Sequence, residues 1–187
     1  MRRALGAAAV AACLLGVGAC SGGEPDAAPS PSSGSSTPSE TPTASPTSTA
    51  EAPTLPPEAM ERTAAGAEAF VRFYFASLNS ALESGDVAAI DRHSEPQCQA
   101  CAFNRDFVSE PYEAGGRWAG GHIRLLEMAT PPLTDAGATV TVRLRQDAGV
   151  KQRGDGSLEA TEAVPPFSAN VYLHWDGAWR VAELTNV

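Results

Sequence analysis

Two closely spaced cysteines are the clearest chemical feature of the sequence. Cys98 and Cys101 form a Cys-x-x-Cys motif in the stretch EPQCQACAFNRDF, where a helix is expected to begin. A pair this close in an exported protein is typical of a disulfide bond, and we prefer this interpretation. A thiol oxidoreductase is the first alternative, because a helix N-terminus lowers a thiol pKa, although such redox motifs usually follow a strand. A zinc site is the second alternative, and it would have to recruit His93 and His122 as further ligands.

Acid–base chemistry has three candidate residues, which are Tyr74, Asp91 and His93. Lining one cavity, they would suit an enzyme that moves protons. We prefer a structural role for each: a tyrosine ring that packs while its hydroxyl finds a partner, and two polar residues on a solvated helix end. The other residues expected near such a cavity are Tyr112, Trp118 and His122. The sequence has neither a Gly-x-Ser-x-Gly motif nor a glycine-rich phosphate loop, and we expect no cofactor.

A third set of polar side chains shares one face of two expected strands. Arg143, Arg145, Tyr172 and His174 alternate with apolar residues, so they are predicted to point away from the core. Arginine and tyrosine are enriched among the residues that dominate binding at protein interfaces. The set therefore predicts either a self-association or partner surface or an ordinary solvated sheet face, which is the commoner case.

The first nineteen residues have the three parts of an export signal. Arg2 and Arg3 precede an apolar stretch, and small residues follow it at positions 18 and 19. The sequence Val17-Gly18-Ala19-Cys20 resembles the bacterial lipobox, whose cysteine receives a diacylglycerol and becomes the new N-terminus. We therefore predict a signal peptide over 1–19 and a lipid on Cys20 that anchors the protein to the outer face of the cytoplasmic membrane.

Residues 20–57 are expected to form a disordered tether. They are almost entirely Ser, Thr, Pro, Ala and Gly, and Leu55 is their only large apolar side chain. Such a segment cannot bury enough surface to offset the entropy of ordering. Losing the signal peptide removes two arginines, so the net charge changes from −9 to about −11, which argues against nucleic acid as a partner.

Residues 58–187 are expected to form one domain that starts with helices. Gly85 is predicted to cap the first helix, and Asp86 to start a short second helix that ends near His93. A third helix is expected from about Gln99 to Glu113, bent or ended near Pro111. Apolar side chains at steps of three and four define one face of the first helix, namely Met60, Ala64, Ala67, Val71, Tyr74, Leu78 and Leu82.

The hydrophobic period then changes from helical to two, which is typical of strands. Strands are expected over 122–129, 138–145, 167–175 and 178–185. Hairpins are expected at Asp176-Gly177 and, with a weaker signal, at Gly154-Asp155-Gly156. Helices first and antiparallel strands afterwards predict an α+β domain with its helices on one face of a curved sheet.

This layout resembles the nuclear-transport-factor-2-like fold, a cone whose sheet wraps a long N-terminal helix. The closing stretch DGAWRVAEL is similar to the last hairpin of that superfamily. With the lipobox, the tether and the Cys-x-x-Cys motif, the chain resembles a family of uncharacterised actinobacterial lipoproteins, a resemblance that carries over no catalytic residues. Because some cone-shaped relatives are isomerases, cyclases or dehydratases, the resemblance leaves a small enzyme as an alternative. We prefer a non-catalytic module that binds an envelope protein, a cell-wall component or a small apolar ligand.

Overall fold

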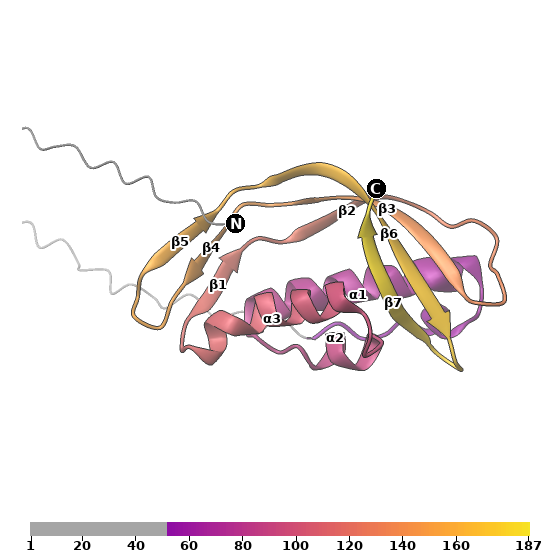
Figure 1. Ribbon diagram of the computed structural model, residues 1–187, viewed down its shortest axis with the longest axis horizontal. Helices are drawn as coiled ribbons and strands as arrows, with labels where there is room; N and C mark the ends of the chain where they lie inside the picture. Colours follow the sequence, from indigo (N-terminus) through magenta and orange to yellow (C-terminus); the bar gives the residue numbers. More distant parts are fainter. Residues whose placement is uncertain (1–51) are drawn as a thin grey trace, which may run out of the picture. The chain divides into compact units, whose positions relative to one another are not determined.

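The structure, a computed structural model, describes residues 52–187. The predictions for residues 1–19, for Cys20 and for the tether up to residue 51 lie outside this range. Within it, three α-helices are followed by antiparallel strands, so the α+β prediction is confirmed. Figure 1 shows the helices gathered on one side of a curved sheet. No helix in the described part of the chain is both long and apolar enough to cross a membrane.

The first long helix, α1 (Ala64–Ser84), has defined caps at both ends. Thr63 Oγ1 accepts a hydrogen bond from Gly66 N at 2.9 Å, which marks the N-terminus. Gly85 ends the helix with φ of 79°, as predicted. The expectation that Met60 lies on this helix is wrong, because the chain forms a separate 3-10 turn, η1 (Pro57–Met60), and Met60 is 58% exposed. Leu55 precedes that turn and packs against the core.

Two shorter helices follow α1. Helix α2 (Ala88–His93) begins one turn after Gly85, and Asp86 Oδ1 accepts from Ala88 N at 2.9 Å although Val87 holds the N-cap position. Helix α3 (Gln99–Glu113) has the predicted bounds and keeps Pro111 inside it.

The tolerance of Pro111 within α3 has a specific cause. A proline has no N–H to offer the carbonyl four residues earlier, which here is that of Phe107. Trp118 Nε1 donates to the Phe107 carbonyl at 3.3 Å and so replaces the missing helical bond.

The strands form two antiparallel sheets. One has the order β2-β3-β6-β7 and the other β1-β4-β5. The strands predicted from alternation and both predicted hairpins are present, whereas β1, β4 and β5 were not predicted, because four residues are too few to show a period of two. The strands are β1 (Arg117–Gly120), β2 (Ile123–Ala129), β3 (Ala138–Gln146), β4 (Gly149–Gln152), β5 (Leu158–Thr161), β6 (Val164–Trp175) and β7 (Trp179–Asn186).

Three pairs of consecutive strands, β1–β2, β3–β4 and β5–β6, pass from one sheet to the other through a bend. Between β1 and β2 the chain turns at Gly120 and Gly121, which have φ of 74° and 78°. A side chain at Gly120 would place its Cβ 2.9 Å from the Ala148 carbonyl oxygen, so only glycine fits this close approach. Hydrogen bonds continue across the bend, from Gly121 N to Ala148 O at 3.0 Å and from Asp147 N to His122 O at 2.9 Å. The result is a long ribbon that curves over the helices (Figure 1).

Helix α1 packs against the concave face of the four-stranded sheet. The alternation predicted for β3 is confirmed, because its apolar positions are buried and Arg143 and Arg145 are exposed. Helix α1 is covered on several sides, as its successive aromatic residues predicted, since Phe73, Tyr74 and Phe75 are all buried.

A single side chain ties α1 to the edge of the sheet near the bend. Asn79 Nδ2 donates to the Ile123 carbonyl at 2.9 Å, and Asn79 Oδ1 accepts from Ile123 N at 2.8 Å. The side-chain amide thus pairs with one residue of β2 as a neighbouring strand would. These two hydrogen bonds help to set the distance between α1 and β2, and therefore the space between the helix and the sheet.

Candidate functional site

An apolar opening lies between the helices and the concave face of the sheet. It consists of two adjoining hollows of about 230 Å³ and about 330 Å³. The inner hollow, near the end of α1, contacts Leu78, Leu82, Phe107 and Val108. The outer hollow lies toward β6 and β7 and includes Phe75, Ala100, Leu144, Phe167, Ala169, Leu184, Thr185 and Asn186. Both hollows share Phe103, Asn104, Ile123 and Gln146, and we call the whole opening the α3 groove.

Helix α3 forms one wall of the α3 groove with an aromatic row. Phe103 and Phe107 stack with their ring centroids 6.1 Å apart, and Phe107 contacts Trp118 on β1 at 4.7 Å. Phe107 and Trp118 are held by the core, whereas Phe103 is 68% exposed. An aromatic ring this exposed, at the junction of two hollows, is free to pack on a ligand.

The polar groups of the α3 groove are neutral. Gln146, which lines both hollows, donates from its Nε2 to the Gly121 carbonyl at 3.0 Å. The Asn104 amide forms no side-chain hydrogen bond to another residue in 52–187, so its donors and acceptor are available. Thr185 and Asn186 add a hydroxyl and an amide at the β7 end. The lining therefore suits an uncharged ligand that buries apolar surface and makes a few directed hydrogen bonds.

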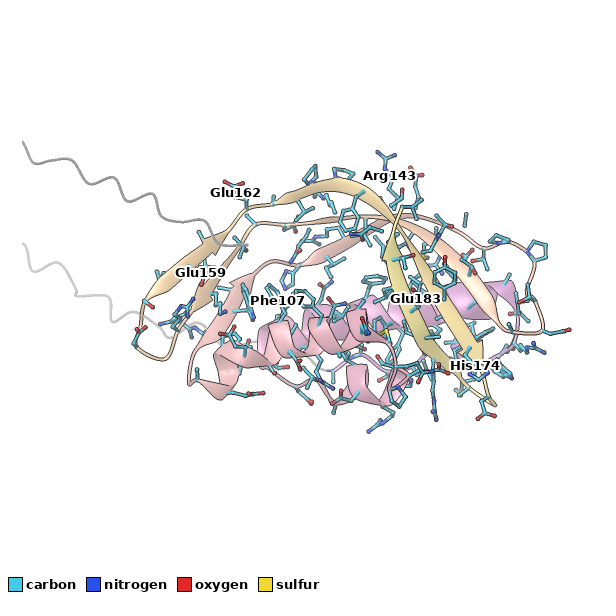
Figure 2. The ribbon with its side chains drawn as sticks, viewed as in Figure 1. Phe107, Arg143, Glu159, Glu162, His174 and Glu183 are labelled. Atoms are coloured by element: carbon cyan, nitrogen blue, oxygen red, sulfur yellow. A yellow bond between two sulfur atoms is a disulfide. The ribbon has the colours of Figure 1, made fainter. Side chains whose placement is uncertain are left out.

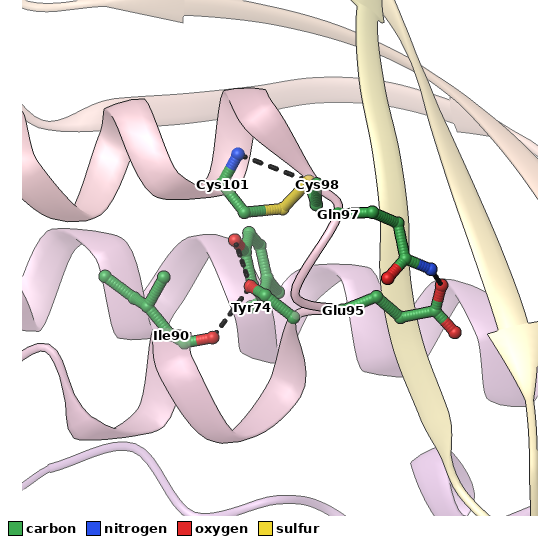
Figure 3. The surroundings of a disulfide bond; sticks show 7 residues. Tyr74, Ile90, Glu95, Gln97, Cys98 and Cys101 are labelled. Carbon is green, nitrogen blue, oxygen red and sulfur yellow. Dashed lines mark hydrogen bonds between the residues drawn. A yellow bond between two sulfur atoms is a disulfide. The ribbon is translucent and has the colours of Figure 1, made fainter.

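The disulfide predicted from the Cys-x-x-Cys motif is confirmed. Cys98 and Cys101 are joined by a disulfide at the start of α3, with their Cα atoms 5.2 Å apart, and each is 2% exposed (Figure 3). Cys98 Sγ also accepts from Cys101 N at 3.2 Å, so the bridge closes the first turn of the helix. Both sulfurs are used in the bond, so neither is a free thiolate that could bind zinc in this state. In the described part of the chain, no cluster of three His, Cys, Asp or Glu residues could hold a metal.

Tyr74 lies beneath the disulfide and is fully engaged. Its hydroxyl contacts Ser94 Oγ at 3.0 Å, and Ser94 Oγ donates to the Ile90 carbonyl at 2.7 Å, so the tyrosine is the donor in this chain (Figure 3). Burial raises the pKa of Tyr74 to about 12, while the hydrogen bond with Ser94 acts in the opposite direction. A hydroxyl this hard to ionise is suited to a structural hydrogen bond rather than to proton transfer near neutral pH.

Asp91 and His93 have different surroundings from each other. Asp91 is exposed and pairs with Arg105 at 3.4 Å, beside a hollow of about 150 Å³ that the disulfide also lines. His93 is half-buried, and its ring packs edge-on against Phe73 with centroids 5.0 Å apart. Burial lowers the pKa of His93 below its ordinary value, and Arg92 adds to this effect. No hydrogen bond joins Tyr74, Asp91 and His93 in the described chain, and none of them lines the α3 groove.

The residues expected around the third helix serve packing and pairing. Tyr112 donates to the Leu82 carbonyl at 2.6 Å, and burial raises the pKa of its hydroxyl. Trp118 supports α3 as described above. His122 Nε2 lies 2.9 Å from Glu83 Oε1 but forms no hydrogen bond with a residue of the described chain.

The Arg, Tyr and His set on the outer sheet face is divided between two places. Arg143 pairs with Glu127, and Arg145 with Asp147, each at 3.7 Å. Tyr172 lies opposite Thr139, four residues along β3 from Arg143, so the two groups are about 13 Å apart. Figure 2 shows Arg143 on the curve of the sheet and His174 near its far end. The predicted interaction surface stays a prediction, and its arginines already have acidic partners.

His174 takes part in a short polar chain. Its Nδ1 lies 2.6 Å from Glu95 Oε1, and the other oxygen of that carboxylate accepts a hydrogen bond from Gln97 (Figure 3 shows Glu95 and Gln97). The Glu95 backbone N–H also donates to the Val181 carbonyl at 2.9 Å, which fixes the segment between α2 and α3 against β7. This chain secures the loop that precedes the disulfide.

Three residues of the α3 groove were not foreseen from the sequence, namely Phe103, Asn104 and Gln146. Helix α3 alone carried a signal, because Phe103 and Phe107 are two large apolar residues at helical spacing. Gln146 carried none, since it lies just beyond the alternating stretch of β3. Its role depends on the bend at Gly121, which the alternation of β2 and β3 does not encode.

The fold is an α+β domain with an apolar groove under its curved sheet. Residues 42–185 match a family described as a family of unknown function (DUF6318), and the chain belongs to that family. No curated protein matches the sequence.

Three solved structures are similar at low identity. The intermembrane space region of the chloroplast protein ARC6 has 12% identity and a TM-score of 0.48, covering 68% of this chain and 98% of that one. Aln2 from a Streptomyces species has 11% identity and a TM-score of 0.41, covering 65% and 90%. A protein from Catenulispora acidiphila has 16% identity and a TM-score of 0.40, covering 66% and 91%.

Proposed function

We propose that this chain is a non-catalytic binding module of the cell envelope that holds an uncharged apolar ligand in the α3 groove. The observation that carries the proposal is the lining of the groove, which consists of aromatic and aliphatic side chains with a few neutral amides and a hydroxyl. Such a lining retains a ligand through buried apolar surface and hydrogen bonds rather than through proton transfer.

The proposed location rests on the N-terminal sequence. A lipid on Cys20 would hold the domain at the outer face of the cytoplasmic membrane, and residues 20–57 would serve as the tether. The groove would then be presented close to the apolar molecules of the envelope. The disulfide supports this placement, because such bonds persist in oxidising compartments.

We also propose that the domain is a nuclear-transport-factor-2-like cone. Support comes from the long α1 against the concave face of the sheet and from the glycine bend that curves the ribbon over it. In such a cone, the space between helices and sheet is the natural place for a ligand. Part of this space is filled by the aromatic residues of α1, and the α3 groove is the part left open.

The test is binding of N-phenylnaphthylamine, an uncharged probe whose fluorescence rises in apolar surroundings. The protein is the chain from residue 20 onward with Cys20→Ser, prepared under oxidising conditions. We expect saturable binding that Ala100→Trp weakens by about tenfold or more, because an indole would occupy the outer hollow.

The matched control is Ala76→Trp, which adds the same side chain at an exposed position of α1. It should leave probe binding unchanged. The proposal would be contradicted if the protein did not bind the probe, or if the Ala100→Trp variant bound it as tightly as the unsubstituted protein. Circular dichroism of each variant separates a blocked groove from a misfolded protein.

A further inference from the structure

We propose that the ligand of the α3 groove is a single acyl chain with an uncharged polar end, such as an ester or hydroxyl. This inference rests on the proposed function and specifies its ligand. Three properties of the groove support it: its length, its lack of charge in the lining, and the position of its neutral polar groups.

The groove is elongated. On α3 its lining runs from Ala100 to Val108, eight residues or about 12 Å of helix. On the sheet it extends from Ile123 on β2 to Leu184 on β7, across all four strands and so about 14 Å. A compact ring system would fill one hollow, whereas a linear chain can occupy both.

The polar groups of the groove are absent from the residues that line the inner hollow alone, and they line either both hollows or the outer hollow. Apart from the residues shared with the outer hollow, the inner hollow contacts only Leu78, Leu82, Phe107 and Val108. Asn104 and Gln146 line both hollows, and Thr185 and Asn186 line the outer hollow alone. A chain inserted into the inner hollow would therefore bring its polar end to neutral hydrogen-bonding groups.

The ligand should be uncharged because nothing in the lining balances a charge. The side chains of both hollows include no Arg, Lys, His, Asp or Glu within the described residues. Burying a carboxylate there would leave it without a cationic partner, which is costly. The protein as a whole is also acidic, with a net charge of −9, so an anion gains nothing from the surrounding field.

The exposed ring of Phe103 is placed to cover an acyl chain bound in the groove. Its ring belongs to both hollows and is held by stacking on Phe107 alone among the aromatic contacts of the described chain. A chain that threads past Phe103 would be covered by its ring. This side chain would then lose most of its exposure to water, which contributes to binding.

The experiment is displacement of bound N-phenylnaphthylamine by monoacylglycerols of increasing chain length, from hexanoyl to palmitoyl, below their micelle-forming concentrations. We expect the affinity to rise by up to about fourfold for each added methylene that is buried, and then to reach a plateau when the groove is full. The fatty acid of equal chain length should compete more weakly at neutral pH.

The variant Asn104→Leu tests the polar end. It should weaken monoacylglycerol binding by about fivefold to tenfold, the value of a hydrogen bond, and should weaken it more than it weakens binding of the probe. Phe103→Ala should weaken every acyl ligand, whereas Ala76→Trp should change none of them.

Failure of this inference can be told apart from failure of the proposed function. Suppose that Ala100→Trp blocks probe binding, but that no acyl chain displaces the probe or that chains of every length displace it equally. This result would overturn the inference of an acyl ligand and leave the proposed function of the apolar groove intact. Stronger competition by the fatty acid, or by an apolar peptide, would also overturn it. Absence of probe binding would overturn both.

Discussion

The pairing of Asn79 with Ile123 predicts a large effect from one exchange on α1. Asn79→Ala removes both side-chain hydrogen bonds, of 2.9 Å and 2.8 Å, and leaves the N–H and the carbonyl of Ile123 without those partners. Each partly buried backbone group left unpaired costs about 1 to 2 kcal/mol. Alanine is the better helix former by roughly 0.5 kcal/mol, which offsets part of the loss. The net decrease in unfolding free energy should be about 2 to 3 kcal/mol.

The assay is urea unfolding followed by tryptophan fluorescence, with thermal unfolding as a second measure. A loss of this size should lower Tm by about 6 to 12 °C in a domain of this length. Asn104→Ala is the matched control, because it makes the same exchange inside α3 at a side chain with no hydrogen bond to another described residue. It should change stability by less than about 0.5 kcal/mol.

The reasoning would be refuted if Asn79→Ala were no more destabilising than Asn104→Ala. That result would mean that water or a shifted strand satisfies Ile123 at little cost. Because Ile123 also lines the α3 groove, Asn79→Ala should in addition weaken probe binding, even under conditions where the protein stays folded.

Two further predictions concern Tyr74 and Gly85. The pKa of Tyr74 is raised from 10.0 to about 12 in the fold, so its contribution to stability is complete below pH 10 and is lost as the pH rises toward 12. In alkaline unfolding curves, Tyr74→Phe should remove this pH-dependent loss of stability. At neutral pH the same exchange should cost about 1 to 2 kcal/mol, because the hydrogen bond to Ser94 is lost. Gly85→Ala should cost more than about 2 kcal/mol in thermal unfolding, because φ is 79° and the new Cβ would lie 2.5 Å from the Tyr112 ring. Gly177→Ala, where φ is 73° and the space is open, should cost only about 1 kcal/mol, and equal costs for the two exchanges would show that the contact with Tyr112 is unimportant.

The sequence was most informative where structure depends on near neighbours. The period of α1, the cap at Gly85 and the hairpin at Asp176-Gly177 are set by a few adjacent residues, and all three are present. The disulfide belongs to the same class, because three residues of separation leave little choice of geometry. The start of α1 was misplaced, since apolar spacing alone extends to Met60, whereas the hydroxyl of Thr63 fixes the N-terminus.

The candidate site was poorly predicted because it is made by distant segments. Tyr74, Asp91 and His93 were the candidates for the alternative of an enzyme, with a structural role preferred for each, and none of them lines the α3 groove. Their side chains are taken up by Ser94, Arg105 and the aromatic rings of α1, respectively. Residue type indicates what a side chain can do, and only its surroundings decide whether it is free to do it.

The sequence by itself determined that the helices precede the antiparallel strands, the apolar faces of α1 and β3, and the bridge between Cys98 and Cys101. These follow from steric limits, hydrophobic period and chain connectivity, which act over a few residues. The tertiary structure alone decided that an opening is left between α3 and the sheet, that the ribbon bends at Gly120 and Gly121, and that Phe103 is left exposed. Packing between elements far apart in the chain sets these features, because the space left between a helix and a sheet depends on every side chain that holds them apart.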